Sequence, residues 1–294
     1  MELGAVLSPS GAAGPTPSMG WRWEAILAQA RRAEAAGLAS VWLGDGPPDP
    51  GAGPALGPLD PLVGLAALTR ATATITLGTL LWAPLRPPVV LAKALATLDR
   101  LSGQRLVVSL GPGPATGCAE VGLEAESAER RRARLADTVA IVRGLDEGGP
   151  LRLRGRVLAV DGARNRPPPG PGRPPLWIGG GAAVDDLVAP VPERAPGASH
   201  AGGWGPIRVS GVDGYRRAAA ALHGGARPGA PAAVAVLTEA GGDVAELAAR
   251  LRGWAEAGAA AVVARGDLDI LVEAGRLAGV CPASEPPSSS SSCS

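Results

Sequence analysis

Three consecutive glycines at 179–181 form the pattern in this sequence that most directly suggests ligand chemistry. They follow the short apolar run Leu176-Trp177-Ile178 and precede a segment with a helical pattern. Backbone N–H groups in the first turn of a helix have no partner within the helix, and the helix dipole makes that end positive. The pattern therefore predicts a loop suited to phosphate. The alternative is a flexible turn between a strand and a helix.

A second glycine-rich loop, Gly111-Pro112-Gly113, follows the apolar run at 105–110. Glycine has no Cβ, so a ligand can approach the backbone closely after such a strand. A helical pattern ends near Leu101, and a Ser102-Gly103 turn leads into the strand. A single Gly-x-Gly indicates no particular ligand. Its position after a helix, a turn and a buried strand is stronger evidence for a ligand-binding loop than the two glycines alone.

Composition and charge argue against several classes of function. The net charge is +1, which gives no basic surface of the kind that nucleic-acid binding requires. The two histidines, His200 and His223, and the three cysteines show no metal-ligand spacing, and no Gly-x-Ser-x-Gly pattern of a hydrolase occurs. We expect no metal site and a reducing compartment. Without a signal peptide or a long apolar helix in the sequence, we expect a cytoplasmic protein with no membrane contact.

Short apolar runs alternate with helical patterns, which predicts one α/β domain. Strands are expected at 2–7, 39–44, 73–78, 105–110, 175–179, 199–203, 232–237 and 260–264. Helices are expected at 22–36, 61–71, 87–101, 127–144, 182–190, 211–223, 243–257 and 267–279. Eight strand–helix units in a chain of this length are typical of a single (β/α)8 TIM barrel, whose active site lies at the carboxyl ends of the strands.

Residues 145–174 do not fit the alternation and are predicted to be an insertion before strand five. Within them, 151–160 alternates apolar and polar residues around Gly155, which predicts a hairpin. We expect this insertion to lie over the barrel mouth and to help form a lid. The barrel domain is expected over 1–281. The serine-rich tail at 282–294 has nothing to bury and is predicted to be disordered.

Five segments, taken in order, resemble the bacterial luciferase-like family of oxidoreductases, which use FMN or the deazaflavin coenzyme F420. The resemblance covers roughly residues 1–280, and it is carried by the phrase at 93–113 and the segments Val41-Trp42-Leu43-Gly44-Asp45, Ile75-Thr76-Leu77-Gly78-Thr79, Trp177-Ile178-Gly179-Gly180-Gly181 and Ser199-His200-Ala201. It implies a reduced FMN or F420 at the carboxyl ends of the strands. The cofactor phosphate would lie at Gly180, Gly181 and Ala182.

The resemblance implies cofactor-binding residues after four of the expected strands. Asp45 would hydrogen-bond the ring edge or a substrate, although an aspartate there also suits a cap of the turn before Pro47. The family has a cis peptide bond behind the ring, which carried over would be Leu80–Leu81; the alternative is a strand end with no special geometry. The implied set is Asp45, Gly78, Thr79, Leu80, Gly111, Gly179, Gly180, Gly181 and Ala182.

Three positions depart from the family's pattern. Gly46 stands where the family often has histidine, and Gly202 stands where it has aspartate. Pro114 occupies the position of the catalytic glutamate in the sugar-phosphate dehydrogenase branch, so that branch's acid–base pair is missing and its activity is excluded. The catalytic residues remain unknown. Asp45 and His200 are the two candidates, and we interpret His200 as structural.

Two reactions are compatible with the resemblance. Either reduced FMN from a separate reductase reacts with O2 and the substrate is oxygenated, or hydride passes between the deazaflavin and the substrate. We expect a small organic substrate and leave a homodimer open. A second hypothesis, motivated by the three changed positions, is a barrel that binds a cofactor or ligand without turnover. The run Glu129-Arg-Arg-Arg-Ala-Arg is interpreted as a solvated helix face, with contact to an anionic group as the alternative.

Overall fold

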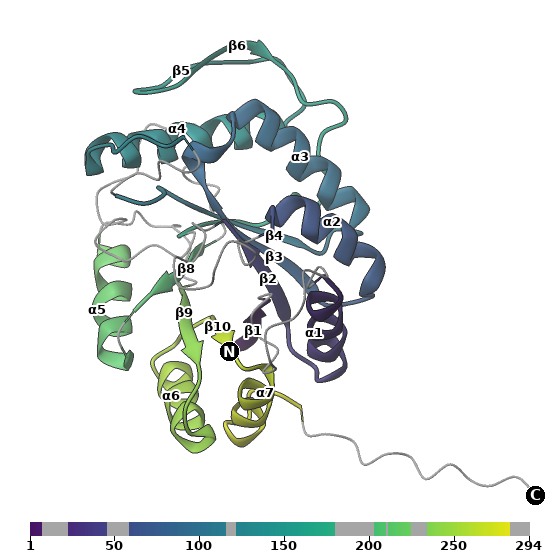
Figure 1. Cartoon of the computed structure of the whole chain (residues 1–294). Helices are drawn as coiled ribbons and strands as arrows, with labels where there is room; N and C mark the ends of the chain where they lie inside the picture. Colours follow the sequence, from purple (N-terminus) through teal and green to yellow (C-terminus); the bar gives the residue numbers. More distant parts are fainter. Residues whose placement is uncertain are drawn as a thin grey trace, which may run out of the picture.

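The computed structural model of the protein describes residues 1–7, 23–45, 59–115, 122–179, 203–209, 211–224 and 234–282. Eight parallel strands form a closed barrel in the order β1-β10-β9-β8-β7-β4-β3-β2 (Figure 1). These strands are β1 (Glu2–Val6), β2 (Ser40–Gly44), β3 (Thr76–Trp82), β4 (Leu106–Gly111), β7 (Leu176–Ile178), β8 (Gly203–Arg208), β9 (Val234–Ala240) and β10 (Ala261–Gly266). β1 closes the ring, because it pairs with both β10 and β2. The predicted parallel α/β architecture is confirmed.

The third strand begins later than the sequence pattern predicts. Its expected range was 73–78, and the observed range is Thr76–Trp82. The carboxylate of Glu34 accepts hydrogen bonds from the three backbone N–H groups of 73–75 and holds this segment as a bend before the strand. Burial of Glu34 raises its pKa, and these three N–H donors outweigh that effect and lower the pKa.

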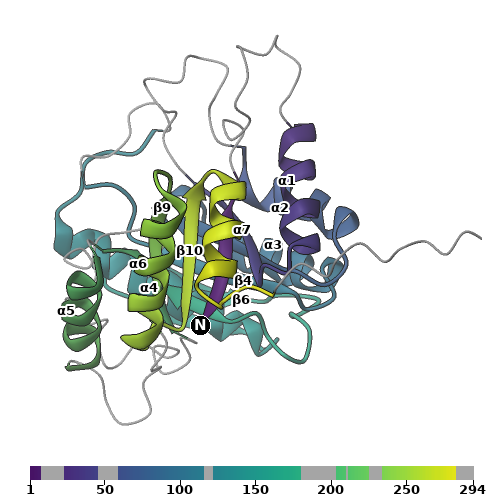
Figure 2. The same ribbon diagram turned by 90° about the horizontal axis from the view of Figure 1, so that it is seen from below.

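Helices pack around the outside of the barrel (Figures 1 and 2). They are α1 (Trp23–Ala35), α2 (Pro61–Ala71), α3 (Pro88–Leu101), α4 (Ala128–Asp146), α5 (Gly211–Gly224), α6 (Val244–Glu256) and α7 (Leu268–Leu277), with the short 3-10 helix η1 (Ala83–Leu85) after β3. Aspartate or serine caps begin four of them, because an oxygen side chain satisfies the free N–H groups of the first turn. The helix predicted at 182–190 lies outside the described residues. None of the described helices is both long and apolar enough to cross a membrane.

A separate hairpin follows α4 and is formed by β5 (Leu151–Arg154) and β6 (Ala159–Ala163). Figure 1 shows it outside α4 and α3, away from the barrel strands. The buried carboxylate of Asp137 on α4 accepts hydrogen bonds from backbone N–H groups 156–158 at the hairpin turn. The chain then runs along α3, where the Asn165 amide donates to the Ala92 carbonyl and the Gly170 N–H donates to Asp99.

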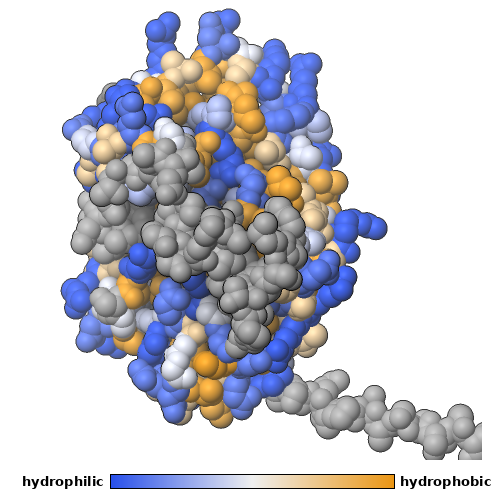
Figure 3. Space-filling view, in the orientation of Figure 1, coloured by the Kyte–Doolittle hydropathy of each residue, from blue (hydrophilic) through white to orange (hydrophobic). Residues whose placement is uncertain are grey.

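The expected lid over the barrel mouth is therefore wrong for this hairpin. Its half-buried leucines alternate with exposed arginines along β5, so one face packs on the helix layer. Hydrophilic side chains project at the upper edge of the molecule in Figure 3, where Figure 1 places β5 and β6. The alternating pattern specified a hairpin with one covered face, but it carried no information about which surface covers that face.

In the described part of the chain, buried apolar residues form two clusters, one between strands and helices and one inside the barrel. The interior cluster contains Val6, Trp42, Leu80, Leu237 and Val263. Trp42 lies across β3, because Gly78 has no side chain: a Cβ there would be 2.2 Å from the Trp42 ring. The barrel below the mouth is thus a packed core.

The last described residues, Cys281 and Pro282, pack against the chain that follows α1. The Cys281 thiol donates to the Ala36 carbonyl at 3.1 Å, and the Pro282 ring lies against Gly37. Burial raises the pKa of this thiol. The remaining tail, at 283–294, lies outside the described residues.

Candidate functional site at the barrel mouth

Two tryptophans form the floor of the barrel mouth. Trp42 and Trp177 project into the barrel with ring centroids 5.9 Å apart and an interplanar angle of 37°. Trp42 is buried and its indole N–H donates to Ser40 Oγ at 2.8 Å, whereas Trp177 is only half-buried. The interior of the barrel therefore ends in an aromatic surface.

Glycines occupy the next inward-facing positions above these rings. Gly44 is two residues after Trp42, and Gly179 is two residues after Trp177. Because side chains alternate along a strand, both glycines share the inward face with the tryptophans. Gly111 is likewise two residues after Ser109, whose hydroxyl donates inward to the Gly205 carbonyl of β8. Glycine at these strand ends keeps side chains off the inward face above the aromatic floor. Neighbouring strands come close there, because a Cβ would be 3.1 Å from Leu80 at Gly44 and 2.8 Å from Gly205 at Gly179.

The repeated Trp-x-Gly spacing is a signal that the sequence analysis missed. It occurs as Trp42-Leu43-Gly44 and again as Trp177-Ile178-Gly179. In each strand it places a large ring inside the barrel and a residue without a side chain above it. In a barrel, the spacing predicts an aromatic floor with no side chain at the next inward-facing position of each strand.

Asp45 follows β2 and binds within the protein instead of pointing into open space. Its carboxylate accepts from both Nη atoms of Arg86, at 2.7 and 2.9 Å, and from the Trp82 N–H at 2.9 Å. The Asp45 side chain is only 4% exposed. The contact with a ring stays a prediction, and Gly46 and Pro47, which the alternative cap would involve, lie outside the described residues.

Arg86 links Asp45 to Asp60, the N-cap of α2. Its Nη2 is 2.7 Å from Asp60 Oδ2, while Asp60 Oδ1 accepts from the N–H groups of Leu62 and Val63. Burial lowers the pKa of Arg86, and the two carboxylates outweigh that effect and raise it. Likewise, burial raises the pKa of Asp60, and Arg86 and the capped N–H groups bring it below its usual value. This network fixes the chain after β2 and β3 at one edge of the mouth.

The three predicted site residues in β3 do not share one role. Gly78 and Leu80 face the barrel interior beneath the mouth, where Gly78 makes room for Trp42. Thr79 is fully buried on the opposite face, toward the helices, so its hydroxyl cannot reach a ligand in the barrel. The carried-over cis bond is also wrong: among the described residues only Arg166–Pro167 is cis, and Leu80–Leu81 is trans.

Gly179 and Gly205 bring β7 and β8 close together at the mouth. A Cβ on Gly179 would be 2.8 Å from the backbone of Gly205, and Gly205 itself has φ +115°. The phosphate loop at Gly180, Gly181 and Ala182 lies outside the described residues. So do His200 and the changed positions Gly46 and Gly202.

Two charged residues on the far side of the mouth were not singled out from the sequence. Glu239 and Arg265 are register partners on β9 and β10 and are exposed. Each lies two residues beyond an inward-facing core residue, Leu237 or Val263, so both face the mouth. They are candidates for polar contacts with a substrate.

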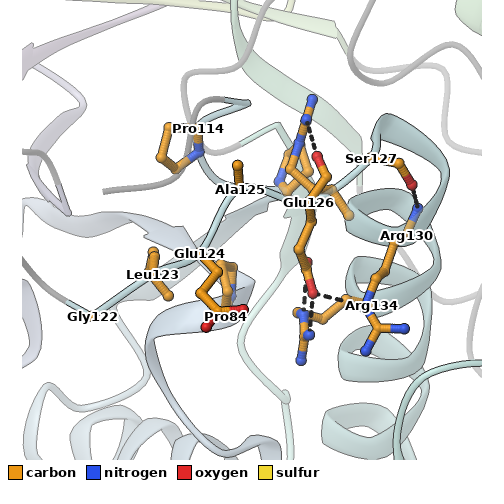
Figure 4. Close-up of a pocket in the computed structure, with 12 residues that line it drawn as sticks. Pro84, Pro114, Gly122, Leu123, Glu124, Ala125, Glu126, Ser127, Arg130 and Arg134 are labelled. Carbon is orange, nitrogen blue, oxygen red and sulfur yellow. Dashed lines mark hydrogen bonds and ion pairs between the residues drawn. The ribbon is translucent and has the colours of Figure 1, made fainter. Parts of the chain in front are cut away.

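A cavity of about 600 Å³ lies between the ends of β3 and β4 and the start of α4 (Figure 4). Its volume is in the range of small-molecule sites. Prolines 84, 112 and 114 form one wall, and residues 122–127 with three arginines of α4 form the other. The sequence-predicted loop at Gly111-Pro112-Gly113 therefore borders a real cavity.

Glu126 organises the charged wall of this cavity. Its carboxylate accepts from Arg130 Nε at 3.0 Å and from Arg134 Nη2 at 2.5 Å, and Figure 4 shows the carboxylate beside Arg134. Its carbonyl accepts from Arg131 Nη1. The hydrogen bond from Arg134 lowers the pKa of Glu126 below the usual glutamate value, burial opposes this, and Arg130 adds to the lowering. The arginine run is thus only partly the solvated face expected from the sequence, since Arg131 is 6% exposed.

Comparison with known proteins shows which family and which fold this chain shares. Residues 1–236 match the family model of luciferase-like monooxygenases. A curated relative, 5,10-methylenetetrahydromethanopterin reductase of Archaeoglobus fulgidus, is 30% identical over 116 residues. That match covers 39% of this chain and only 33% of the relative.

Two solved structures share the fold at low sequence identity. An F420-dependent secondary alcohol dehydrogenase in complex with an F420–acetone adduct superposes with a TM-score of 0.74 at 16% identity, covering 94% of this chain and 97% of the other. A riboflavin lyase with modified FMN and the substrate riboflavin gives a TM-score of 0.57 at 18% identity, covering 87% of this chain and 66% of the other. Together with the family match over most of its length, the barrel places this chain in the luciferase-like monooxygenase family.

Proposed function

We propose that the protein is an oxidoreductase that binds reduced FMN or reduced F420 in its barrel mouth and acts on a small organic substrate. The observation that carries this proposal is the aromatic floor of Trp42 and Trp177 beneath strand ends that carry glycine. A flat ring can lie on such a floor with its edges against backbone groups. Membership of a family whose structural relatives include F420 and FMN proteins supports the same assignment.

The residues of this chain would supply position and exclusion of water. Trp177 would cover one face of the ring, and Gly44, Gly111 and Gly179 would admit its edges. The bound cofactor supplies the redox chemistry, either hydride transfer or oxygenation with O2. Gly180, Gly181 and Ala182 would hold the phosphate through backbone N–H groups, because none of them offers a hydroxyl.

The wider setting forms part of the same proposal. We place the cofactor site in a complete (β/α)8 barrel in a cytoplasmic protein, with the helix at 182–190 supplying the phosphate-binding end. An FMN enzyme would need a partner reductase, and the chain would work as a monomer or a homodimer.

A second candidate function is ligand binding without turnover. The observation that favours it is that the Asp45 side chain is only 4% exposed and its carboxylate accepts hydrogen bonds from Arg86 and the Trp82 N–H. The residue after it is Gly46, so this edge of the mouth lacks the family's polar pair. Consumption of reduced cofactor in the presence of small ketones, alcohols or O2 separates the two functions.

The proposal is tested by anaerobic titration of reduced FMN and reduced F420 into the wild type and Gly180→Asp. A carboxylate at the phosphate position should weaken the cofactor that binds by at least about tenfold through charge repulsion. Gly241→Asp is the matched control, because Gly241 lies in another loop at the strand ends with nothing within 4 Å of its Cβ position. Equal affinity in wild type and Gly180→Asp would refute the phosphate assignment, and absence of binding by either cofactor would refute the function.

A further inference from the structure

Charged side chains gather on the half of the barrel mouth that lies next to the proposed ring site. The aromatic floor and the glycines above it belong to β2, β4 and β7. β8, β9 and β10 follow β7 side by side around the barrel (Figure 1). Each of these three strands carries a charged residue at or next to its last position, in the order Arg208, Glu239 and Arg265.

All three charged residues lie on the inward face of their strands. Glu239 and Arg265 follow interior residues of the barrel by two positions, and Arg208 is the register partner of the interior residue Leu237. Side chains alternate along a strand, and the chain neighbours of the three face the other way. Those neighbours, which pack between strands and helices, include Ile207, Ala240 and Ala264. The three charged side chains therefore face the mouth, where all three residues are exposed.

The strand ends that carry Glu239 and Arg265 are held together by backbone contacts. The Asp267 N–H donates to the Ala240 carbonyl at 3.0 Å. Gly266 approaches the same carbonyl so closely that a Cβ on it would be 2.1 Å from the oxygen. Glu239 and Arg265 are register partners on these neighbouring strands, which lie about 5 Å apart. Side chains on strand ends fixed in this way suit a binding site.

The three charges are not neutralised by the rest of the described structure. Within the described ranges, the charged groups of Arg208, Glu239 and Arg265 form no ion pair or hydrogen bond. At the other edge of the mouth, by contrast, Asp45 and Arg86 bind each other through two hydrogen bonds. Two guanidiniums and one carboxylate give this half of the mouth a net positive charge of one. One strand separates β8 from β10, so the two arginines start about 10 Å apart and can both reach one anion between them.

We propose that Arg208, Glu239 and Arg265 bind the substrate, and that this substrate is a small organic acid that also carries a neutral hydrogen-bond donor. The two guanidiniums bind its carboxylate, and Glu239 accepts a hydrogen bond from its hydroxyl or aromatic amine. A carboxylate fits better than a phosphate monoester, because the phosphate carries close to two negative charges at pH 7 and the three side chains supply one net positive charge. This inference rests on the proposed function, because it places the substrate beside the proposed ring site.

The test uses small probes of similar shape at pH 7. 2-Aminobenzoate carries a carboxylate and an amine donor, 2-aminobenzamide is its neutral amide, benzoate lacks the amine, and phenyl phosphate carries a phosphate. Fluorescence titration gives the dissociation constants of the two amines, and competition with 2-aminobenzoate gives those of the other two. The variants are Arg208→Gln, Arg265→Gln and Glu239→Gln. The control Arg217→Gln removes an exposed arginine of α5, on the outside of the barrel.

We expect wild type to bind 2-aminobenzoate at least about tenfold more tightly than 2-aminobenzamide, because charge-assisted hydrogen bonds are the strong ones. Each arginine variant should lose most of this preference, and the control should keep it. Unchanged affinity of the arginine variants for the neutral amide shows that they keep their fold. In Glu239→Gln both acids should bind more tightly, because a like charge is gone, but 2-aminobenzoate should lose its advantage over benzoate.

Equal affinity of wild type for the acid and its amide overturns the inference, and so does an arginine variant that keeps the full preference. If the advantage of 2-aminobenzoate over benzoate survives in Glu239→Gln, Glu239 does not contact the donor. If phenyl phosphate displaces 2-aminobenzoate better than benzoate does, the ligand is a phosphate and the carboxylate assignment is wrong. Separate titration with reduced FMN and reduced F420 distinguishes the two proposals. Failure of both cofactors to bind refutes the proposed function, whereas loss of the acid preference with intact cofactor binding refutes only the substrate class.

Discussion

At the scale of single residues, the buried charged side chains at the mouth of this barrel pair with one another and stabilise the fold. Asp45 shows this most clearly, because a strand-end aspartate in a glycine-rich loop suits ligand binding. Its partner Arg86 is 41 residues away in the chain and follows η1. No local pattern identifies such a pair, so the sequence predicted the position of Asp45 but not its role.

Asp45→Asn should destabilise the protein by about 2–4 kcal/mol. The substitution leaves the guanidinium of Arg86, only 17% exposed, with Asp60 as its single charged partner. The free energy of unfolding from urea titration measures the effect. Asp213→Asn is the control, because its ion pair with Arg216 is exposed and should be worth less than about 1 kcal/mol. If Asp45→Asn were as stable as wild type but bound the cofactor more weakly, Asp45 would contact the ligand and the structural role given to it here would be wrong.

Gly78→Ala should cost about 1–3 kcal/mol, because the new methyl group would overlap the Trp42 ring and force it to move. Urea unfolding gives the cost, and the tryptophan fluorescence spectrum reports the displaced ring. Gly241→Ala, where nothing lies within 4 Å of the new carbon, should be close to neutral. Equal stability of the two variants would mean that the interior of the barrel is not packed as described.

At the scale of elements, α4 is tied to its surroundings at both ends and in the middle. Glu126 fixes its first turns, Asp137 holds the β5–β6 hairpin, and Arg143 near its end pairs with Asp146 and donates to the Pro174 carbonyl. Burial raises the pKa of Asp146, while Arg143 opposes this. The wall of the cavity that α4 forms is therefore held rigidly in place, and rigid elements suit a binding site.

Asp137→Asn should destabilise the protein by about 1–3 kcal/mol, since the buried carboxylate accepts three backbone N–H groups and an amide cannot. Amide hydrogen exchange at residues 156–158 should become faster. Cofactor affinity should stay within about twofold, because the hairpin packs on the outside of α4 and α3. A large loss of cofactor affinity would support the lid that the structure contradicts.

Replacement of Glu126 should have a pH-dependent effect on stability. The folded-state pKa of Glu126 is below its ordinary value of 4.5, so its contribution is complete above that pH and is lost as the pH falls through the folded pKa. Glu126→Gln should therefore be less stable than wild type by about 1 kcal/mol at pH 7, and the difference should shrink as the pH falls through the folded-state pKa of Glu126. Urea unfolding of both proteins across this range checks the prediction. A difference that is constant with pH would show that the Glu126 charge is not involved.

At the scale of the whole molecule, the barrel was predictable and its surfaces were not. Alternation of apolar runs with helical patterns predicted the seven described α-helices and seven of the eight barrel strands. The sixth strand was predicted at 199–203, whereas β8 spans Gly203–Arg208 and shares only Gly203 with that range. The remaining features depend on contacts between residues far apart in the sequence. Hydrogen bonds to Glu34 hold the residues before β3 as a bend, and the segment that includes the hairpin packs on α3 and α4. Thr79 is buried on the face of β3 that lies away from the mouth. The glycines at the strand ends were recognised, whereas the tryptophans beneath them were not.

The central claim is that a reduced flavin or deazaflavin lies on the floor formed by Trp42 and Trp177. The most direct test is a crystal structure of the protein grown anaerobically with reduced F420, and with reduced FMN. The account predicts the ring in van der Waals contact with Trp177, with its edges at Gly111 and Gly179 and its phosphate at Gly180. A ring bound elsewhere on the protein, or a side chain of the protein filling the space above Trp177 in the cofactor-bound form, would contradict it.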